Sequence, residues 1–165
     1  MITVRAMTTE DSQQVLRINA GSQPHVAPLN ERELGRLMAL PNEHLVAIEN
    51  GESALGYTLA FHREAPYDGE EFLLLRAALA EPFVYIDQVA VAARHKGLGI
   101  GRALYEALER IVGRRRIRFL CCEVNTKPSN LDSSAFHKSM GFEFFATLRT
   151  LDGREVELLT KTLCR

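Results

Sequence analysis

Cysteine is scarce in this chain, and the few cysteines form no recognisable pattern. The sequence contains Cys121, Cys122 and Cys164, an odd number that argues against a disulfide framework. It also lacks a Cys-x-x-Cys pair and a His-Glu-x-x-His motif, so we expect no zinc site and no metal cofactor. We therefore expect all three cysteines to be reduced thiols.

Long apolar runs are absent as well. No stretch approaches the roughly 18 consecutive apolar residues of a membrane span. The chain reaches an acidic residue, Glu10, without the apolar segment of a secretory signal. These absences predict a cytoplasmic protein without a membrane partner.

Neither sign of charge dominates the sequence. The 20 Lys and Arg residues stand against 21 Asp and Glu residues, which leaves a net charge of -1. Such a chain has no overall field that attracts nucleic acid, so any anion site must be local. Arg114, Arg115, Arg116 and Arg118 form a basic run, but no aromatic residue alternates with them, and basic residues complement the dipole at a helix end. We interpret the run as a solvated turn and expect no nucleic-acid partner.

The overall composition is typical of one globular domain. The length of 165 residues fits the usual domain size, and a hydrophobic content of 46% with 25% charged residues is sufficient for a packed core. Neither an internal repeat nor a linker interrupts the sequence. We expect residues 1–165 to form a single domain.

Hydrophobic periodicity and turn residues predict a mixture of strands and helices. The pairs Asn50-Gly51 and Asp152-Gly153 each indicate a hairpin. Residues 72–80 are apolar and stay undecided between a short helix and a lid. The predicted strands cover 2–6, 44–49, 54–62, 83–91, 117–124, 142–151 and 155–162, and the predicted helices cover about 8–21, 29–40, 99–112 and 131–140.

The most informative segment lies between a predicted strand and a predicted helix. Glycines at alternate positions let the backbone expose consecutive N–H groups where the positive end of the helix dipole also points. Three cations within the same segment suit a pyrophosphate better than a carboxylate. We interpret the segment as a phosphate site, although a tight turn that packs helix on strand would use the same glycines. Its residues are Arg94, His95, Lys96, Gly97, Leu98, Gly99, Ile100, Gly101 and Arg102.

Two common phosphate motifs do not fit this spacing. A Walker loop needs four residues between its glycines followed by Gly-Lys-Ser/Thr, and the sequence has no such run. The dinucleotide fingerprint Gly-x-Gly-x-x-Gly finds Arg102 in its third glycine position when it is counted from Gly97, and Leu104 when it is counted from Gly99. The pattern that fits is Arg/Gln-x-x-Gly-x-Gly/Ala, which starts at Arg94.

This pattern resembles the coenzyme A motif of the GNAT N-acetyltransferase superfamily. A second segment, from Asn130 to Phe142, resembles the family's Asn-x-x-Ala-x-x-Leu-Tyr-x-Lys-x-Gly-Phe, and the predicted elements follow the family's order over nearly the whole chain. The resemblance implies an α/β (α+β) fold with a mixed, mostly antiparallel sheet of six to seven strands and about four helices. It also implies that the sheet splays apart between its fourth and fifth strands.

The resemblance further implies acetyl-CoA as the acyl-donor co-substrate in that gap. The backbone of Val89 and Val91 would pair with the pantetheine, and residues 97–102 would hold the pyrophosphate. Asn130 and Phe136 would line the other side of the cofactor. Asn130 is also a good helix N-cap and Phe136 also suits a core position, so both keep a structural alternative.

Acetyl transfer requires a neutral amine, so an ammonium group must first lose a proton. Asp87, in the strand before the glycine segment, and Glu123, in the next strand, are the candidate bases. A structural ion pair or a substrate contact is the alternative for Asp87. Strict alternation along the strand predicts that Asp87 shares a side with Val89 and Val91.

His137 is the third candidate catalytic residue. Many proteins of the family that the sequence resembles use a tyrosine at this place to protonate the departing CoA thiolate. An imidazolium with a pKa near 6.5 is a competent proton donor. The alternative is a helix histidine that is hydrogen-bonded to the backbone.

We therefore expect a direct N-acetyltransferase that acts on a primary amine of a small molecule, a peptide or a protein. The missing tyrosine motivates an alternative, a CoA-binding regulatory domain that has lost turnover. The carboxylates of Glu64, Asp68, Glu70 and Glu71 would favour a cationic amine, unless they belong to an exposed solubilising loop. A homodimer is compatible with this hypothesis.

Overall fold

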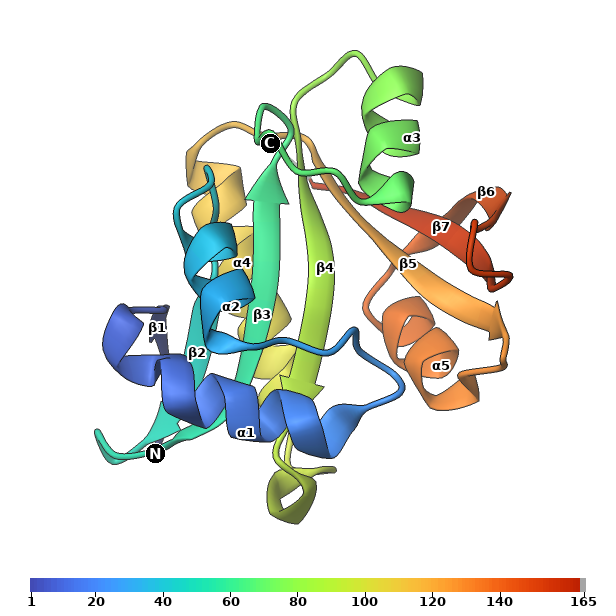
Figure 1. Ribbon diagram of the computed structural model, residues 1–165. Coiled ribbons are helices and arrows are strands. Elements are labelled where there is room, and N and C mark those ends of the chain that lie inside the picture. The colour runs from blue at the N-terminus through green and yellow to red at the C-terminus, as the bar shows by residue number, and fades with distance from the viewer. Residues whose placement is uncertain (164–165) are drawn as a thin grey trace.

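Residues 1–163, which the computed structural model describes, are built on a seven-stranded sheet with helices on both faces (Figure 1). Cys164 lies outside the described residues, and Cys121 and Cys122 are free thiols. The strands are β1 (Ile2–Ala6), β2 (Leu45–Glu49), β3 (Ala54–His62), β4 (Phe83–Val91), β5 (Phe119–Lys127), β6 (Glu143–Arg149) and β7 (Glu155–Thr162). The α-helices are α1 (Ser12–Ser22), α2 (Glu31–Met38), α3 (Glu70–Ala78), α4 (Ile100–Arg114) and α5 (Leu131–Ser139), and the 3-10 turns are η1 (Thr9–Asp11) and η2 (Ala93–His95).

The sheet is mixed and mostly antiparallel, as predicted. Its strand order is β1-β2-β3-β4-β5-β7-β6, and the β4–β5 pair alone is parallel among the described strands. The β4–β5 ladder runs from Phe83 opposite Phe119 to Ile86 opposite Cys122 and ends there. Beyond this point the two strands diverge (Figure 1). The predicted gap between the fourth and fifth strands is confirmed.

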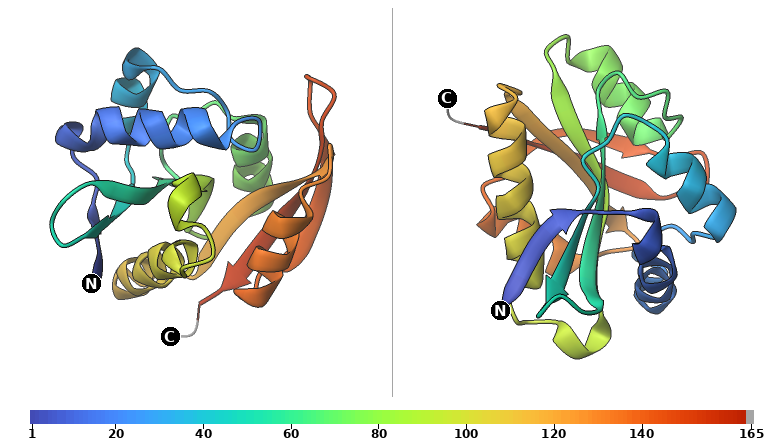
Figure 2. Two further views of the ribbon diagram at one scale, coloured as in Figure 1. Left: turned by 90° about the horizontal axis from the view of Figure 1, so that it is seen from below. Right: turned by 90° about the vertical axis from the view of Figure 1, so that its left-hand side faces the viewer.

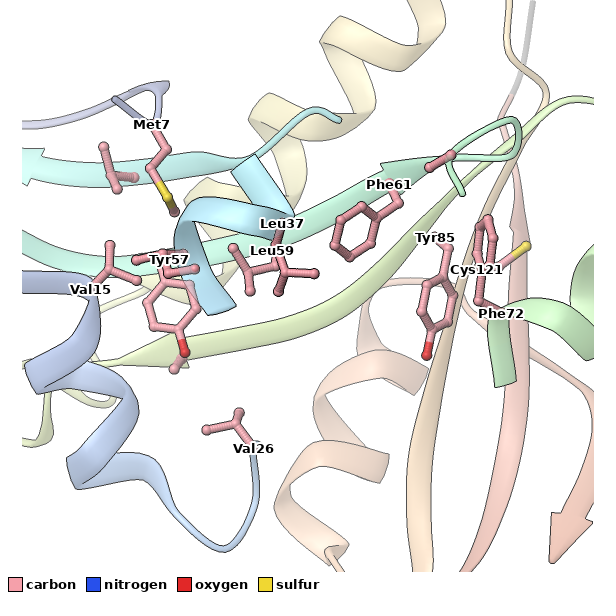
Figure 3. Close-up of a cluster of buried hydrophobic side chains, with 14 of the residues drawn as sticks. Met7, Val15, Val26, Leu37, Tyr57, Leu59, Phe61, Phe72, Tyr85 and Cys121 are labelled. Atoms are coloured by element: carbon pink, nitrogen blue, oxygen red, sulfur yellow. The ribbon is translucent and has the colours of Figure 1, made fainter. Parts of the chain in front are cut away.

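The helices form a layer on each face of the sheet. Helices α1, α2 and α3 cover one face, and α4 and α5 cover the other (Figure 2). Each layer of helices packs on its own hydrophobic cluster. Figure 3 shows Tyr57 and Phe61 of β3 with Tyr85 of β4 in the cluster beneath α1, α2 and α3. Burial of these apolar faces is the main stabilising contribution to the fold. None of the helices in this part of the chain is both long enough and apolar enough to cross a membrane.

The segment that the sequence left undecided is the helix α3, so residues 1–163 contain five α-helices rather than about four. Phe72 and Leu75 are fully buried. The Phe72 ring packs 6.0 Å from that of Phe83 and 5.7 Å from that of Tyr85, measured between centroids. Residues 72–75 are all apolar, and such a run carries no helical period that would distinguish a helix from a buried strand.

A β-bulge at Asp87 corrects the predicted orientation of this side chain. Leu59 pairs with Gln88 and Ala60 pairs with Ile86, so Asp87 is an extra residue on β4. An extra residue reverses the alternation beyond it. Asp87 therefore faces the α3 side of the sheet, where its carboxylate meets Tyr67, whereas Val89 and Val91 pack on the α4 side. The prediction that Asp87 shares a side with these valines was wrong.

The buried His44 predicts that the stability of the fold depends on pH. Its Nδ1 accepts the N–H of Ala60 at 2.9 Å, and its Nε2 lies 3.3 Å from the carbonyl oxygen of Leu37, so a neutral imidazole satisfies both partners. Burial lowers the pKa of His44 from 6.5 to about 4. Because the folded-state pKa lies below the unfolded value, the stability contributed by neutral His44 is present above pH 6.5 and is lost as the pH falls toward 4.

From pH 7 to pH 5, this single group should lower the free energy of unfolding by about 2 kcal/mol. Urea denaturation at the two pH values measures the effect. His44→Gln should show a pH effect smaller than that of the wild type by this amount, whereas substitution of the exposed His25 to Gln should not. An undiminished pH effect in His44→Gln would contradict the assignment.

Candidate active site

A groove of about 890 Å³ opens where β4 and β5 diverge. The turn between β4 and α4 forms one part of its wall. The carboxylates of Asp87 and Glu123 lie in another part, which we call the carboxylate end of the groove. Arg94 and Leu98 belong to the same turn but are not among the lining residues. The predicted site residues that do line the groove are Asp87, Val89, Val91, Lys96, Gly97, Gly99, Ile100, Gly101, Arg102, Glu123, Asn130, Phe136 and His137.

The glycine turn requires backbone conformations that favour glycine. The φ angles of Gly97 and Gly99 are +79° and +80°, and Gly99 is the N-cap of α4. A Cβ added to either glycine would have no atom within 4 Å, so the space beside the turn is open. The unpaired N–H groups of the first turn of α4 begin at this open space, which is the arrangement that binds phosphate.

A buried nitrogen in the same turn points to a missing partner. Nδ1 of His95 is buried and has no hydrogen-bond partner among the described residues, and His95 lines the groove. Buried polar atoms are nearly always paired, so an unpaired one calls for an explanation. A phosphate oxygen would supply the missing contact. The open cradle and this nitrogen together fit the pyrophosphate of coenzyme A.

The opposite wall of the groove comes from α5. Oδ1 of Asn130 accepts the N–H of Ser133 at 3.3 Å and so caps the helix. The Phe136 ring would lie 3.5 Å from a Cβ added to Gly101, and its centroid is 5.2 Å from that of Tyr105. Asn130 thus caps a helix and Phe136 packs against an aromatic ring, which are the structural alternatives that the sequence left open. Both residues also line the groove.

Asp87 and Glu123 each accept a hydrogen bond from a phenol. Tyr67 donates to Oδ1 of Asp87 at 2.8 Å, and Tyr85 donates to Oε2 of Glu123. The Phe72 ring contacts both tyrosines, with centroid distances of 5.6 Å to Tyr67 and 5.7 Å to Tyr85. Figure 3 shows Phe72 beside Tyr85 at the junction of β4 and β5. The aromatic packing therefore holds the two phenol–carboxylate pairs near each other.

Both carboxylates have raised pKa values. Burial raises the pKa of Asp87 to about 6, against the opposing effect of the Tyr67 hydrogen bond. Burial and the charge of Asp87 raise the pKa of Glu123 well above its ordinary value. A general base works best when its pKa lies near the working pH, and burial brings a carboxylate toward that range. The pair is therefore suited to accept a proton.

Several residues at the carboxylate end were not among the predicted catalytic or cofactor-binding residues. Tyr67 and Glu71 lie before and within α3, Asn125 is on β5, and Arg154 precedes β7. The loop of residues 22–28 between α1 and α2 also lines the groove. Only Glu71 had a signal in the sequence, as a member of the acidic stretch; the others follow no motif.

The four carboxylates of the acidic stretch at residues 64–71 lie in different surroundings. Glu71 lines the groove, whereas Glu70 accepts the backbone N–H of Leu151 at 3.0 Å. Glu64 is exposed, and the side chain of Asp68 is 84% exposed. The predicted attraction of a cationic amine therefore rests on Glu71 together with Asp87 and Glu123.

His137 is buried in a hydrogen-bonded pair with Tyr105. Its Nδ1 lies 2.8 Å from the carbonyl oxygen of Ser133, which can only accept, so Nδ1 carries the proton. Its Nε2 lies 2.7 Å from the Tyr105 hydroxyl and in this tautomer accepts that O–H. Burial lowers the pKa of His137, with the Ser133 hydrogen bond opposing. These contacts favour the structural alternative of the two that the sequence left open, and the catalytic role stays a prediction.

We expect His137→Ala to lower the free energy of unfolding by about 2 kcal/mol, because it leaves a cavity and an unpaired Tyr105 hydroxyl. The kcat for acetyl transfer should fall by less than about 10-fold. Urea denaturation and steady-state assays measure the two effects. Lys138→Ala is the control, because Lys138 is exposed on the same helix and does not line the groove. A loss of about 100-fold in kcat without loss of stability would instead identify His137 as the proton donor.

The remaining candidate features have no part in the groove chemistry. Arg115 pairs with Glu43 at 2.6 Å and Arg118 with Glu81 at 3.3 Å, and the arginine run does not line the groove. Burial raises the pKa of Cys121 to about 12, which leaves this thiol unreactive. Among residues 1–163, no three His, Cys, Asp or Glu side chains gather in a way that could hold a metal ion.

Comparison with protein families identifies one family over most of the chain. The model of the acetyltransferase (GNAT) family matches residues 12–142. Among curated proteins, none matches the chain.

Solved structures share the fold over nearly the whole chain. The ribosomal-protein-S18-alanine N-acetyltransferase from Escherichia coli superimposes with a TM-score of 0.77 at 19% identity, covering 100% of this chain and 96% of that one. Arabidopsis thaliana NAA60 in complex with acetyl-CoA has a TM-score of 0.77 at 16% identity, covering 99% of both chains. Chaetomium thermophilum Naa20 in complex with a bisubstrate analogue has a TM-score of 0.74 at 20% identity, covering 98% of this chain and 86% of that one.

Proposed function

The chain belongs to the acetyltransferase (GNAT) family, and we propose that it is an N-acetyltransferase that moves the acetyl group of acetyl-CoA directly onto a primary amine. The observation that carries this proposal is that one groove joins an open glycine turn to two carboxylates with raised pKa values. The first feature suits the pyrophosphate of the donor and the second suits the ammonium group of the acceptor.

The groove residues have separate roles toward the donor. When bound, acetyl-CoA supplies an acetyl group activated as a thioester. The N–H groups of residues 97–102 and Nδ1 of His95 would hold its pyrophosphate. The backbone of Val89 and Val91, beyond the end of the β4–β5 ladder, would pair with the pantetheine as an added strand does. Asn130 and Phe136 would close the other side.

Asp87 is the residue that we assign as general base. Its pKa of about 6 leaves it mostly ionised at pH 7, so it can take the proton of an ammonium group directly or through water. Burial and the charge of Asp87 raise the pKa of Glu123 as well, and Glu123 is the second candidate for the role of base. Tyr67 and Tyr85 would orient the two carboxylates.

Support for a peptide or protein acceptor comes from the similar structures. The Escherichia coli protein is named as the N-acetyltransferase of an alanine of a ribosomal protein. The Chaetomium thermophilum protein is in complex with a bisubstrate analogue. A free α-amine with a pKa near 7.7 is about a sixth neutral at pH 7, whereas a lysine amine is less than a thousandth neutral, so the α-amine needs less help from a base. We further propose a single catalytic domain that works in the cytoplasm.

The experiment that tests the function combines the protein, acetyl-CoA and a panel of amines. The panel contains peptides with a free N-terminus, the same peptides with a blocked N-terminus and an internal lysine, and small amines. Release of CoA thiol together with acetylated product in the mass spectrum is the expected result. Tight acetyl-CoA binding without product from any amine would favour the alternative, a CoA-binding regulatory domain.

A further inference from the structure

We propose that Arg154 is a positioning residue for the acetyl transfer: it fixes Glu71 and Asn125 around the carboxylate end of the groove and supplies the positive charge that keeps Asp87 able to accept a proton. The inference rests on the proposed function. It concerns a residue that carries no motif and lies far along the chain from the two carboxylates.

The Arg154 guanidinium joins three elements. Its Nη1 donates to Oδ1 of Asn125 on β5 at 3.1 Å, and its Nη2 lies 3.3 Å from Oε1 of Glu71 on α3. Its Nε donates to Oδ2 of Asp152, in the turn before β7, at 3.0 Å. A planar guanidinium that donates in three directions has a nearly fixed position. Arg154 is therefore held where β5, α3 and the β6–β7 turn meet.

This position matters because of the charges around it. Glu71 is buried, and among the described residues its only ion-pair partner is Arg154. Asp87 and Glu123 lie in the same groove, and Arg154 lowers the pKa of both against the larger effect of burial. The titratable and charged groups that act on this pair are Glu33 of α2, Tyr67 before α3, Glu71 of α3, Tyr85 of β4 and Arg154 before β7.

Removing the Arg154 guanidinium would raise the pKa of Asp87 in two ways. The negative charge of Glu71 would no longer be compensated, and it raises the pKa of Asp87. The loss of the Arg154 charge raises the same pKa. Because a general base works only when ionised, the pH below which transfer fails should then move upward.

A second set of contacts provides the competing structural explanation. Glu70 accepts the N–H of Leu151 at 3.0 Å, so α3 and the β6–β7 turn are joined next to the Arg154–Glu71 pair as well. If Arg154 acted only as part of this connection, its removal would loosen the turn and reduce activity equally at every pH. The pH profile therefore separates the two roles.

The experiment compares Arg154→Met and Arg154→Lys with wild type, and Arg149→Met is the matched control. Arg149 is on the same hairpin, its side chain is 79% exposed, and it pairs with Glu155 at 3.8 Å outside the groove. We measure kcat from pH 5 to pH 9 with saturating acetyl-CoA and the best amine of the panel. In Arg154→Met, the low-pH limb should move upward by at least about one pH unit, which is about a 5-fold loss of kcat at pH 6 and about a 9-fold loss at pH 5.

At pH 9 the kcat of Arg154→Met should approach that of wild type, and acetyl-CoA affinity should be unchanged. Arg154→Lys keeps the positive charge and should restore most of the wild-type limb. Arg149→Met should match wild type throughout. An equal loss of kcat at all pH values, or an unchanged profile in Arg154→Met, would overturn the proposal.

A readout without turnover keeps this proposal separate from the proposed function. The side-chain carboxyl carbons of Asp87 and Glu123 can be followed by NMR in wild type and Arg154→Met. Upward-shifted titration of Asp87 in the variant is expected even if no amine in the panel is acetylated. Identical titration in the two proteins would overturn the role of Arg154, whatever the outcome of the acetylation assay.

Discussion

Gly99→Asp should weaken acetyl-CoA binding by at least about 100-fold, or about 2.7 kcal/mol. Gly99 has a φ of +80° and caps α4, so its N–H and the next ones open toward the groove. A carboxylate at this position repels the pyrophosphate and covers the N–H groups that would bind it. Calorimetric titration with acetyl-CoA measures the loss.

Two further variants separate charge from backbone strain. Gly99→Asn has the same size and the same left-handed conformation without the charge, so it should retain substantially more affinity than Gly99→Asp. Gly51→Asp introduces the same change at a hairpin glycine with a φ of +77° and open space around it, outside the groove. It should bind acetyl-CoA as the wild type does. A folded Gly99→Asp protein with wild-type affinity would show that the glycine turn is not the phosphate site.

Asp87→Asn should lower kcat by at least about 100-fold at pH 7, with little change in acetyl-CoA affinity. The substitution keeps the size of the side chain and a partner for the Tyr67 hydroxyl but removes the base. Since the pKa of Asp87 is about 6, wild-type kcat should fall tenfold per pH unit below this value as the carboxylate is protonated. This limb should be absent from the residual activity of Asp87→Asn. Steady-state assays across pH 5 to 9 measure both effects.

Glu123→Gln and Asp68→Asn complete this series. If Asp87 is the base, Glu123→Gln should cost less in kcat than Asp87→Asn. Asp68→Asn is the control, because its side chain is 84% exposed and lies outside the groove. If Glu123→Gln abolished acetyl transfer and Asp87→Asn lowered kcat only slightly, Glu123 would be the base instead of Asp87.

The sequence was sufficient to predict the elements whose residues signal their own structure. The strands β3, β4 and β7 begin and end where apolar runs meet turn residues such as Asn50-Gly51 and Asp152-Gly153. The glycine turn was also visible, because alternate glycines between a strand and a helix mark a turn with unusual backbone conformations. Helix α3 was not visible, since a short apolar run has no period of its own.

The two predicted bases show how far side-chain alternation predicts the side of the sheet on which a residue lies. Glu123 lies on the side of β5 that alternation predicts, with Cys121, but Asp87 does not follow alternation because a bulge reverses the side chains after it. A bulge depends on how β3 pairs with β4, and the sequence of one strand does not contain that information. The same applies to His137, whose neutral tautomer is set by Tyr105 on another helix and by the Ser133 carbonyl.

By itself, the sequence determined the order of the elements, the open cradle at residues 97–102 and the presence of carboxylates near it, because each depends on residues that are neighbours along the chain. Only the tertiary structure decided which carboxylates share the groove, and that Tyr67, Glu71 and Arg154 surround them. The pKa values of Asp87 and Glu123 follow from burial and from charges that are distant in the sequence, such as that of Arg154. Burial and long-range Coulomb interactions arise only when the chain is folded, so no local pattern could encode them.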